Sequence, residues 1–250
     1  MTRLTDLIAP VIRRFLPPKF TAELRPGEKL AVIGDVHGCT TELVALLDTL
    51  KSEAPEHQIV FVGDYVDRGE DSAGVLALLF EQPDFICLMG NHEVMCLEFL
   101  DQPEDRGRRW LRNGGLQTLS SYGIGNISDI ASPDKLLAAR DALAAAMGAP
   151  LIAWMRDLPY QWKSGNICIT HAGADPDLAM YQQAQRSLIW GHPKFTTRAR
   201  GDGLWVVHGH VIQPEASAID GRIGVDTGAF ATGRLSAALI DDAALRFCTS

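Results

Sequence analysis

The chain has 250 residues, of which 46% are hydrophobic and 22% are charged. This is the composition of an ordinary globular protein, and it excludes the disordered and fibrous classes. The formal net charge of −8 disfavours nucleic acid as a partner, because an acidic surface repels its phosphates. A local cationic pocket for a single phosphate remains compatible with this charge.

The cysteines, at positions 39, 87, 96, 168 and 248, are odd in number, widely spaced and without a CxxC pair. They predict neither a disulfide framework nor a zinc knuckle and favour a reducing compartment. Charged residues interrupt the apolar positions of residues 1–20, which argues against a signal peptide. No later apolar run approaches the roughly 18 residues of a membrane span, so we expect a cytoplasmic protein without a transmembrane segment.

The first residues place apolar side chains at helical spacing, and Pro17 and Pro18 end that pattern. The apolar positions are Leu4, Leu7, Ile8, Val11, Ile12 and Phe15. We expect residues 1–28 to form an N-terminal helical segment that packs on a single domain formed by residues 29–250. A helix for a membrane surface or a partner is the alternative.

From residue 30 on, three short apolar runs each stop at a polar cluster. The runs are Leu30–Ile33 before Gly34-Asp35, Ile59–Val62 before Gly63-Asp64, and Phe85–Met89 before Gly90-Asn91. Runs this short predict buried strands rather than helices. Helix-period leucines and alanines fill residues 40–51 and 71–81 between them. The pattern predicts parallel strands joined by right-handed helical crossovers.

Residues 94–162 have a different character, with Ala- and Leu-rich helical patterns around 135–147 and a loop signal at 113–115. We expect a helical insertion or cap rather than an independent domain. Strand-like runs then resume with shorter connections, which predicts a partly antiparallel second half. These runs are Asn166–Thr170, Leu204–Val207, Arg222–Val225 and Ser236–Ile240.

Polar side chains follow five of the predicted strands. They are Asp35 with His37, Asp64, Asn91, His171, and His208 with His210. In open α/β sheets the ligand crevice lies outside the carboxyl ends of the strands, so we expect these side chains to converge. Oxygen and nitrogen donors without a thiolate suit two divalent ions such as Mn²⁺, Fe²⁺ or Zn²⁺. A shared carboxylate would hold such a pair about 3.5–4 Å apart.

Three motifs, one β-α unit apart, resemble the signature motifs of the phosphoprotein phosphatase (PPP) family of metallophosphoesterases. They are Gly34-Asp35-Val36-His37-Gly38, Gly63-Asp64-Tyr65-Val66-Asp67-Arg68-Gly69 and Gly90-Asn91-His92-Glu93. His171-Ala172-Gly173, Gly209-His210 and Asp226-Thr227-Gly228-Ala229 resemble later elements of the family. Residues 110–115 are similar to the WLxNGG stretch of bacterial and phage protein phosphatases related to the phage lambda enzyme. The resemblance spans about residues 30–230 and implies an α/β, calcineurin-like metallophosphoesterase fold: a mixed β-sandwich flanked by helices, with a helical cap.

Carried over residue by residue, the resemblance implies a metal ligand set. Asp64 bridges two ions, the first of which binds Asp35 and His37, and the second Asn91, His171 and His210. A hydroxide held between two divalent ions forms at neutral pH without a side-chain base. Mn²⁺ is the expected ion, with Fe²⁺ or Zn²⁺ as alternatives.

The same resemblance implies the catalytic residues. His92 is the general acid that protonates the leaving oxygen, and Asp67 fixes its tautomer and favours its protonated form. Arg68 binds two phosphoryl oxygens, and Asn91 contacts the substrate as well as a metal.

Each of these residues also has a purely structural interpretation. Asp35 and Asp64 would serve as helix caps, and His171 as a core histidine. The joint pattern favours the functional interpretation. Of the two neighbouring histidines, we expect His210 to be the metal ligand because Gly209-His210 matches the family's Gly-His. We expect His208 to contact the ligands without binding the metal itself. Asp67-Arg68 taken alone is a surface pair, and Cys39 is more readily a buried small residue than a reactive thiolate.

The chain departs from the family after Ile189-Trp190, where relatives carry a second phosphate-binding arginine. Here Gly191-His192-Pro193-Lys194 follows. We expect His192 to bind substrate in place of that arginine, with its charge titrating near neutral pH. Lys194, Arg112 and Arg198 are the alternatives.

The resemblance implies a metal-dependent phosphomonoesterase that hydrolyses phosphoserine and phosphothreonine in proteins. A small-molecule phosphohydrolase, such as a symmetrical dinucleoside polyphosphate hydrolase, shares all three motifs and is the alternative. A non-catalytic scaffold is disfavoured because every expected ligand and each of Asp67, Arg68 and His92 is present. The partner is a phosphoprotein or a small phosphoester, and the oligomeric state stays open.

Overall fold

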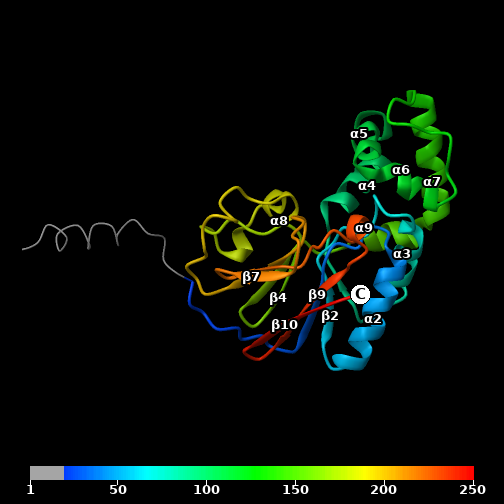
Figure 1. The fold of residues 1–250 in the computed structure, drawn as a ribbon. Coiled ribbons are helices and arrows are strands. Elements are labelled where there is room, and N and C mark those ends of the chain that lie inside the picture. Colours follow the sequence, from blue (N-terminus) through cyan, green and yellow to red (C-terminus); the bar gives the residue numbers. More distant parts are fainter. Residues whose placement is uncertain (1–19) are drawn as a thin grey trace, which may run out of the picture.

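The structure, a computed structural model, describes residues 20–250 (Figure 1). The predicted amphipathic helix falls among residues 1–19, outside the described part of the chain. Residues 20–28 form no helix and run beside the second of two sheets. Phe20 contacts Trp205 edge to face, and the backbone N–H of Arg25 donates to the side-chain oxygen of Asn166 at 2.7 Å.

The first sheet has the strand order β10-β9-β1-β2-β3. Its strands are β1 (Leu30–Ile33), β2 (Gln58–Phe61), β3 (Ile86–Cys87), β9 (Ser236–Asp241) and β10 (Ala244–Thr249). β1, β2 and β3 are parallel, and the crossovers between them are α2 (Thr40–Glu53) and α3 (Ser72–Phe80). The predicted β-α-β-α-β unit is therefore confirmed. β9 and β10 extend it as an antiparallel hairpin.

The second sheet has the order β4-β5-β6-β8-β7. Its strands are β4 (Gln161–Ser164), β5 (Ile167–Thr170), β6 (Trp205–His208), β7 (Ser217–Ile219) and β8 (Arg222–Gly224). The predicted strands β5, β6 and β8 are parallel to one another. The antiparallel pairs are made by β4 and β7 at the two edges, and neither edge strand was predicted.

The two sheets pack face to face because strands of the first sheet are apolar on both sides. Leu30 and Val32 of β1 join Ile169 and Val207 of the second sheet in one core. Ala31 and Ile33 point the other way, into the core beneath the helices. A third core covers the outer face of the second sheet under α8 (Gln185–Trp190), so the predicted sandwich flanked by helices is confirmed (Figure 1).

The predicted insertion is a cluster of helices at one end of the molecule (Figure 1). It contains α4 (Asn91–Asp101), α5 (Pro103–Trp110), a π-helical turn (Leu111–Gly115), α6 (Leu116–Ser121) and α7 (Pro133–Arg156). The loop signal at 113–115 falls on this turn, where Gly114 leaves the helical conformation with a φ of 112° and kinks the chain before α6. α4 starts at Asn91, so the cap grows directly out of the third strand end.

α7 is the one helix of residues 20–250 that is long and apolar enough to cross a membrane by length and composition. This corrects the expectation that no apolar stretch reaches that length. Gly148, with φ 75° and ψ 153°, breaks the helix, and Pro150 follows inside it. Leu136, Leu143 and Met155 are buried, and α7 packs against α4 and α5. Packing within the cap therefore accounts for its apolar face.

Candidate metal and phosphate site

Six strand ends from the two sheets meet at one edge of the sandwich. Backbone and side-chain hydrogen bonds join them across the sheets. Val62, after β2, accepts a hydrogen bond from Nδ1 of His171, after β5, at 3.1 Å. The N–H of Gly209, after β6, donates to the carbonyl of His171 at 2.8 Å, and the N–H of His210 donates to the Asp35 carboxylate at 3.0 Å. The predicted convergence of these residues is thus present.

Two groups of potential metal ligands share Asp64. His37, Asp64 and His92 form one group, and Asp64, His171 and His210 form the other; within each, the donor atoms lie within 4.8 Å of one another. The Nε2 atoms of His37 and His171 lie 3.5 and 3.4 Å from Oδ2 of Asp64. Asn91 joins the second group, since its Oδ1 lies 2.9 Å from Nε2 of His171.

The imidazoles of His37 and His171 are oriented as metal ligands usually are. Nδ1 of each faces a backbone carbonyl, of Val66 at 2.8 Å and of Val62 at 3.1 Å, and must donate its proton there. In the neutral ring Nε2 is therefore unprotonated, and in both residues it faces Oδ2 of Asp64. Nε2 of His37 is buried and has no hydrogen-bond partner among the described residues. The residues thus fit a pair of divalent ions.

Asp35 lies beside these groups together with a carboxylate that the sequence left unassigned. Burial, reinforced by the charges of Asp226 and Asp64, raises the pKa of Asp35 well above its ordinary value. Burial likewise raises the pKa of Asp226. Asp226 follows β8, so the strand-end pattern that selected Asp35 would also have found it.

The electrostatics distinguish Asp64 from the other carboxylates. Burial would raise the pKa of Asp64, but the facing imidazoles of His171 and His92 outweigh it and lower this pKa well below its ordinary value. Burial lowers the pKa of His37 to about 3 and that of His210 to about 4. Ionised Asp64 and neutral imidazoles are the protonation states that metal binding requires.

The backbone is held in an uncommon conformation at the site. Among residues 20–250, eight residues other than glycine have positive φ, and five of them are site residues: His37, Asp64, Asp67, Arg68 and His210. Such positions persist where the surroundings fix them. The buried carboxylate of Glu93 does so for the turn after β2, because it accepts the N–H groups of Asp64, Tyr65 and Val66 at 2.8, 2.7 and 3.2 Å.

His92 and Asp67 form a buried pair, with Nδ1 of His92 2.6 Å from Oδ2 of Asp67. Two cap residues hold this carboxylate: Trp110, which the sequence placed in a motif without a role, and Thr118, which it did not indicate. The indole N–H of Trp110 donates to it at 2.9 Å, and the hydroxyl of Thr118 at 2.7 Å. Burial would lower the pKa of His92, but the charges of Asp64 and Asp67 raise it. Nε2 of His92 lies 3.9 Å from Asp64, facing the ligand groups.

Arg68 lies at the mouth of the site. Its guanidinium carbon is 5.0 Å from the ring centre of Phe230, which in turn contacts the ring of His37 edge to face at 5.3 Å. Arg68, Phe230, Gly114 and Gln117 line a cavity of about 370 Å³. The guanidinium therefore faces an open space beside the candidate metal ligands.

The side chains proposed to replace the second arginine are paired with carboxylates. Nε2 of His192 lies 3.6 Å from Asp175, and Arg112 contacts Asp129 at 3.1 Å. Lys194 and Arg198 both contact Asp177, at 2.7 and 2.8 Å. A substrate contact by His192 stays a prediction.

Two further residues lie apart from the ligand groups. The ring of His208 packs edge to face on Phe195 at 5.0 Å, and its Nδ1 donates to the carbonyl of Gly209 at 3.0 Å. Burial raises the pKa of Cys39 to about 12, which agrees with a small packed residue rather than a reactive thiolate.

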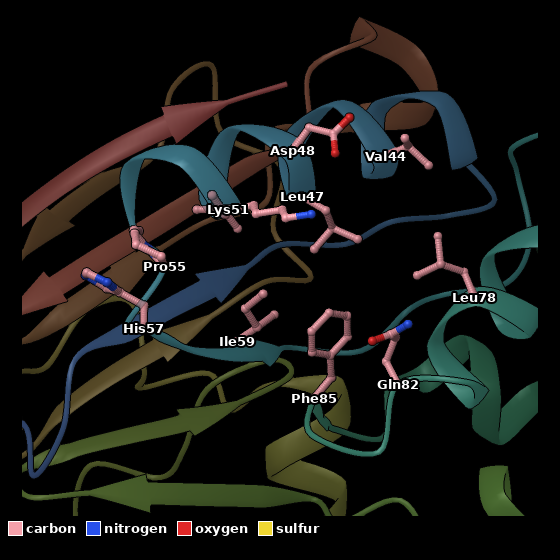
Figure 2. A pocket seen from close by; sticks show the side chains of 12 residues that line it. Val44, Leu47, Asp48, Lys51, Pro55, His57, Ile59, Leu78, Gln82 and Phe85 are labelled. Atoms are coloured by element: carbon pink, nitrogen blue, oxygen red, sulfur yellow. The ribbon is translucent and has the colours of Figure 1, made fainter.

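A second cavity lies away from this edge of the sandwich. It measures about 420 Å³ and is lined mainly by side chains of α2, α3, β2 and the segments before β2 and β3, including the apolar Leu47, Ile59, Leu78 and Phe85 (Figure 2). None of the candidate ligands lines it.

Residues 28–214 match the sequence pattern of the calcineurin-like phosphoesterase family. The chain belongs to this family. It is 27% identical over 213 residues to serine/threonine-protein phosphatase 2 of Salmonella typhimurium, covering 82% of this chain and 89% of the relative. It is 29% identical over 158 residues to a symmetrical bis(5'-nucleosyl)-tetraphosphatase of Coxiella burnetii, covering 62% of this chain and 45% of the relative.

Solved structures share the same fold. A putative diadenosine tetraphosphatase superimposes with a TM-score of 0.63 at 20% identity, covering 92% of this chain and 99% of its own. A protein serine/threonine phosphatase from Saccharomyces cerevisiae gives a TM-score of 0.54 at 19% identity, covering 97% and 86%. The calcineurin-like metallophosphoesterase fold is thus confirmed.

Trp110→Phe tests the contact between the cap and Asp67. The substitution keeps an aromatic ring but removes a donor to a buried carboxylate, which should lower the free energy of unfolding by about 1.5–3 kcal/mol. Trp154→Phe is the control, since its indole N–H makes no hydrogen bond among the described residues. Urea denaturation measures the free energy of unfolding of both variants. An equal loss of stability in the two would contradict the role of the Trp110 N–H.

Asp64→Asn tests the shared ligand. Because Asp64 belongs to both donor groups, we expect the variant to lose metal from both positions, whereas exposed Asp105→Asn should bind as the parent does. Metal analysis after gel filtration in Mn²⁺ measures the stoichiometry. Two tightly bound ions in Asp64→Asn would contradict the shared position.

Proposed function

We propose that this protein is a metal-dependent phosphomonoesterase that hydrolyses phosphoserine and phosphothreonine in proteins. It uses two divalent ions, for which Mn²⁺ is the first candidate and Fe²⁺ or Zn²⁺ the alternatives. The observation that carries the proposal is the position of Asp64. It belongs to two ligand groups and also faces the His92–Asp67 pair. Phosphoryl transfer needs positive charge and a proton donor at the same place, and this edge of the sandwich offers both.

Divalent ions held by Asp35, His37, Asp64, Asn91, His171 and His210 would supply Lewis acidity toward a phosphoryl oxygen and acidify the attacking water. The remaining steps belong to the chain. Arg68 binds phosphoryl oxygens through its fork of N–H donors and neutralises charge as the bond to the leaving oxygen breaks. His92 holds a proton at Nε2 and transfers it to that oxygen.

Asp67 acts on the reaction through His92. Its carboxylate accepts the Nδ1 proton, so the second proton of the imidazolium is carried at Nε2, on the side that faces Asp64. Trp110 and Thr118 fix the carboxylate, and the ring of His92 therefore cannot turn away without breaking a buried hydrogen bond.

Support for a protein substrate comes from the Salmonella relative, which matches over 89% of its length. A small-molecule phosphohydrolase is the second candidate, favoured by the tetraphosphatase relatives and by the diadenosine tetraphosphatase structure that superimposes over 99% of its chain. We place the protein in the cytoplasm, because all five cysteines are free thiols, as expected in a reducing compartment.

A substrate panel tests the proposal. The Mn²⁺-loaded protein is assayed on phosphoserine and phosphothreonine peptides and on diadenosine tetraphosphate. We expect kcat/KM to be higher for the peptides and activity to disappear after chelation. Faster hydrolysis of the dinucleotide would select the small-molecule alternative, and activity undiminished by chelation would contradict both.

His92→Asn tests the proton donor. A general acid contributes about 10²–10⁴-fold, so kcat should fall by that amount on a phosphoserine peptide, whose alkoxide leaving group needs a proton. The loss should be much smaller on p-nitrophenyl phosphate, because nitrophenolate leaves without protonation. Metal content is the control, and equal losses on the two substrates would exclude the acid role.

A further inference from the structure

Arg109 lies at the end of α5 beside the mouth of the site. Its guanidinium carbon is 4.7 Å from the ring centre of Trp190, so the group stacks on the indole. No hydrogen bond or ion pair of this guanidinium occurs within residues 20–250. By contrast, Arg112 and Arg198 are held by Asp129 and Asp177. Arg109 thus keeps its N–H donors available while an aromatic face fixes its position.

The surroundings of Arg109 parallel those of Arg68. Arg68 stacks on Phe230, which contacts the ring of His37 edge to face at 5.3 Å. Arg109 stacks on Trp190, which contacts the ring of His210 edge to face at 6.5 Å and 85°. His37 belongs to one ligand group and His210 to the other. Each group therefore has an aromatic ring beside it that supports a guanidinium.

The backbone links the two arginines through the π-helical turn. The side chain of Asn113 donates to the carbonyl of Arg109 at 2.8 Å, and Asn113 lines the cavity in which Arg68 lies. The carbonyl of Gly114, at the other end of the turn, accepts the N–H of Arg68 at 3.4 Å. Arg109 and Arg68 are thus attached to opposite ends of one short segment at the rim of the site.

We propose that Arg109 is a second phosphate-binding arginine, which acts with Arg68 on the phosphoryl oxygens of the substrate. The proposal rests on the phosphomonoesterase function above. The cation comes from the cap instead of from the residues after Trp190, where Gly191 carries no charge and His192 faces Asp175. A guanidinium stacked on an indole presents its donors at the edge of the ring, which suits the oxygens of a phosphate.

The alternative is that Arg109 only fastens the cap to the segment before Gly191. Both roles need the stacking on Trp190, but only the first adds affinity for an anion. Inorganic phosphate, the product of the reaction, therefore separates them. Its inhibition constant reports binding at the site independently of the leaving group.

The experiment compares Arg109→Gln and Arg109→Lys with Arg108→Gln in the Mn²⁺-loaded full chain. Arg108 is the adjacent residue, exposed and bonded only to the carbonyl of Ala131 at 3.3 Å among the described residues. We expect Arg109→Gln to raise the inhibition constant of phosphate and lower kcat/KM on p-nitrophenyl phosphate, each by about 10- to 100-fold. The inhibition constant and kcat/KM of Arg109→Lys should lie between those of the parent and of Arg109→Gln. For Arg108→Gln both should stay within about twofold of the parent values, as is usual for a surface change.

An unchanged inhibition constant in Arg109→Gln would overturn the inference, whatever happens to kcat. Metal analysis must show the same content in every variant, since a phosphate effect that follows metal loss would overturn it as well. Trp190→Phe preserves a ring for stacking and should retain most of the affinity for phosphate. Trp190→Leu removes the ring and should weaken phosphate binding as much as Arg109→Gln does. A parent protein that hydrolyses no phosphoester would contradict the proposed function itself, and phosphate binding by calorimetry would then test Arg109 alone.

Discussion

The structure depends on the burial of three carboxylates, Asp35, Asp64 and Asp226, at the edge where the two sheets meet. Like charges in a dry site repel one another, and burial alone disfavours their ionised forms. The imidazoles of His171 and His92 offset this for Asp64 only, whereas burial lowers the pKa of the neighbouring His37. Protonation, favoured by the raised pKa values of Asp35 and Asp226, or a bound cation would relieve the remaining repulsion. The ligand chemistry of this edge is therefore a consequence of its electrostatics as well as of its geometry.

Two glycines of the motifs are required at this edge for steric reasons. A Cβ on Gly209 would collide with the carboxylate of Asp35, and one on Gly90 with that of Asp64. The backbone of these turns thus approaches the carboxylates more closely than any side chain allows. Glu93 then ties the turn after β2 to the start of α4 by accepting N–H groups from both. These contacts hold the candidate ligand Asp64 in place.

Most of this site was predictable because its residues follow strand ends, and a strand end is visible as the stop of an apolar run. The strands β1, β2, β5, β6 and β8 were predictable for the same reason, since each is a short apolar run that stops at polar residues. β4, β7 and β10 were missed because they are edge strands, and β7 and β10 are largely exposed, so their residues need no continuous apolar pattern. Trp110 lay in a motif without an assigned role, and Thr118 and Arg109 carried no signal at all, because these residues lie in the cap and their contacts depend on how its helices fold back over the turn after β2.

The cap therefore cannot be regarded as a substrate lid added to a finished catalytic centre. Its residues hold Asp67 on one side, through Trp110 and Thr118, and place Arg109 on Trp190 on the other. The insertion expected to select between a phosphoprotein and a dinucleotide thus also holds the carboxylate that pairs with His92, the proposed proton donor. Changes in the parts of α7 away from these contacts would leave the hydrogen bonds of Asp67 intact.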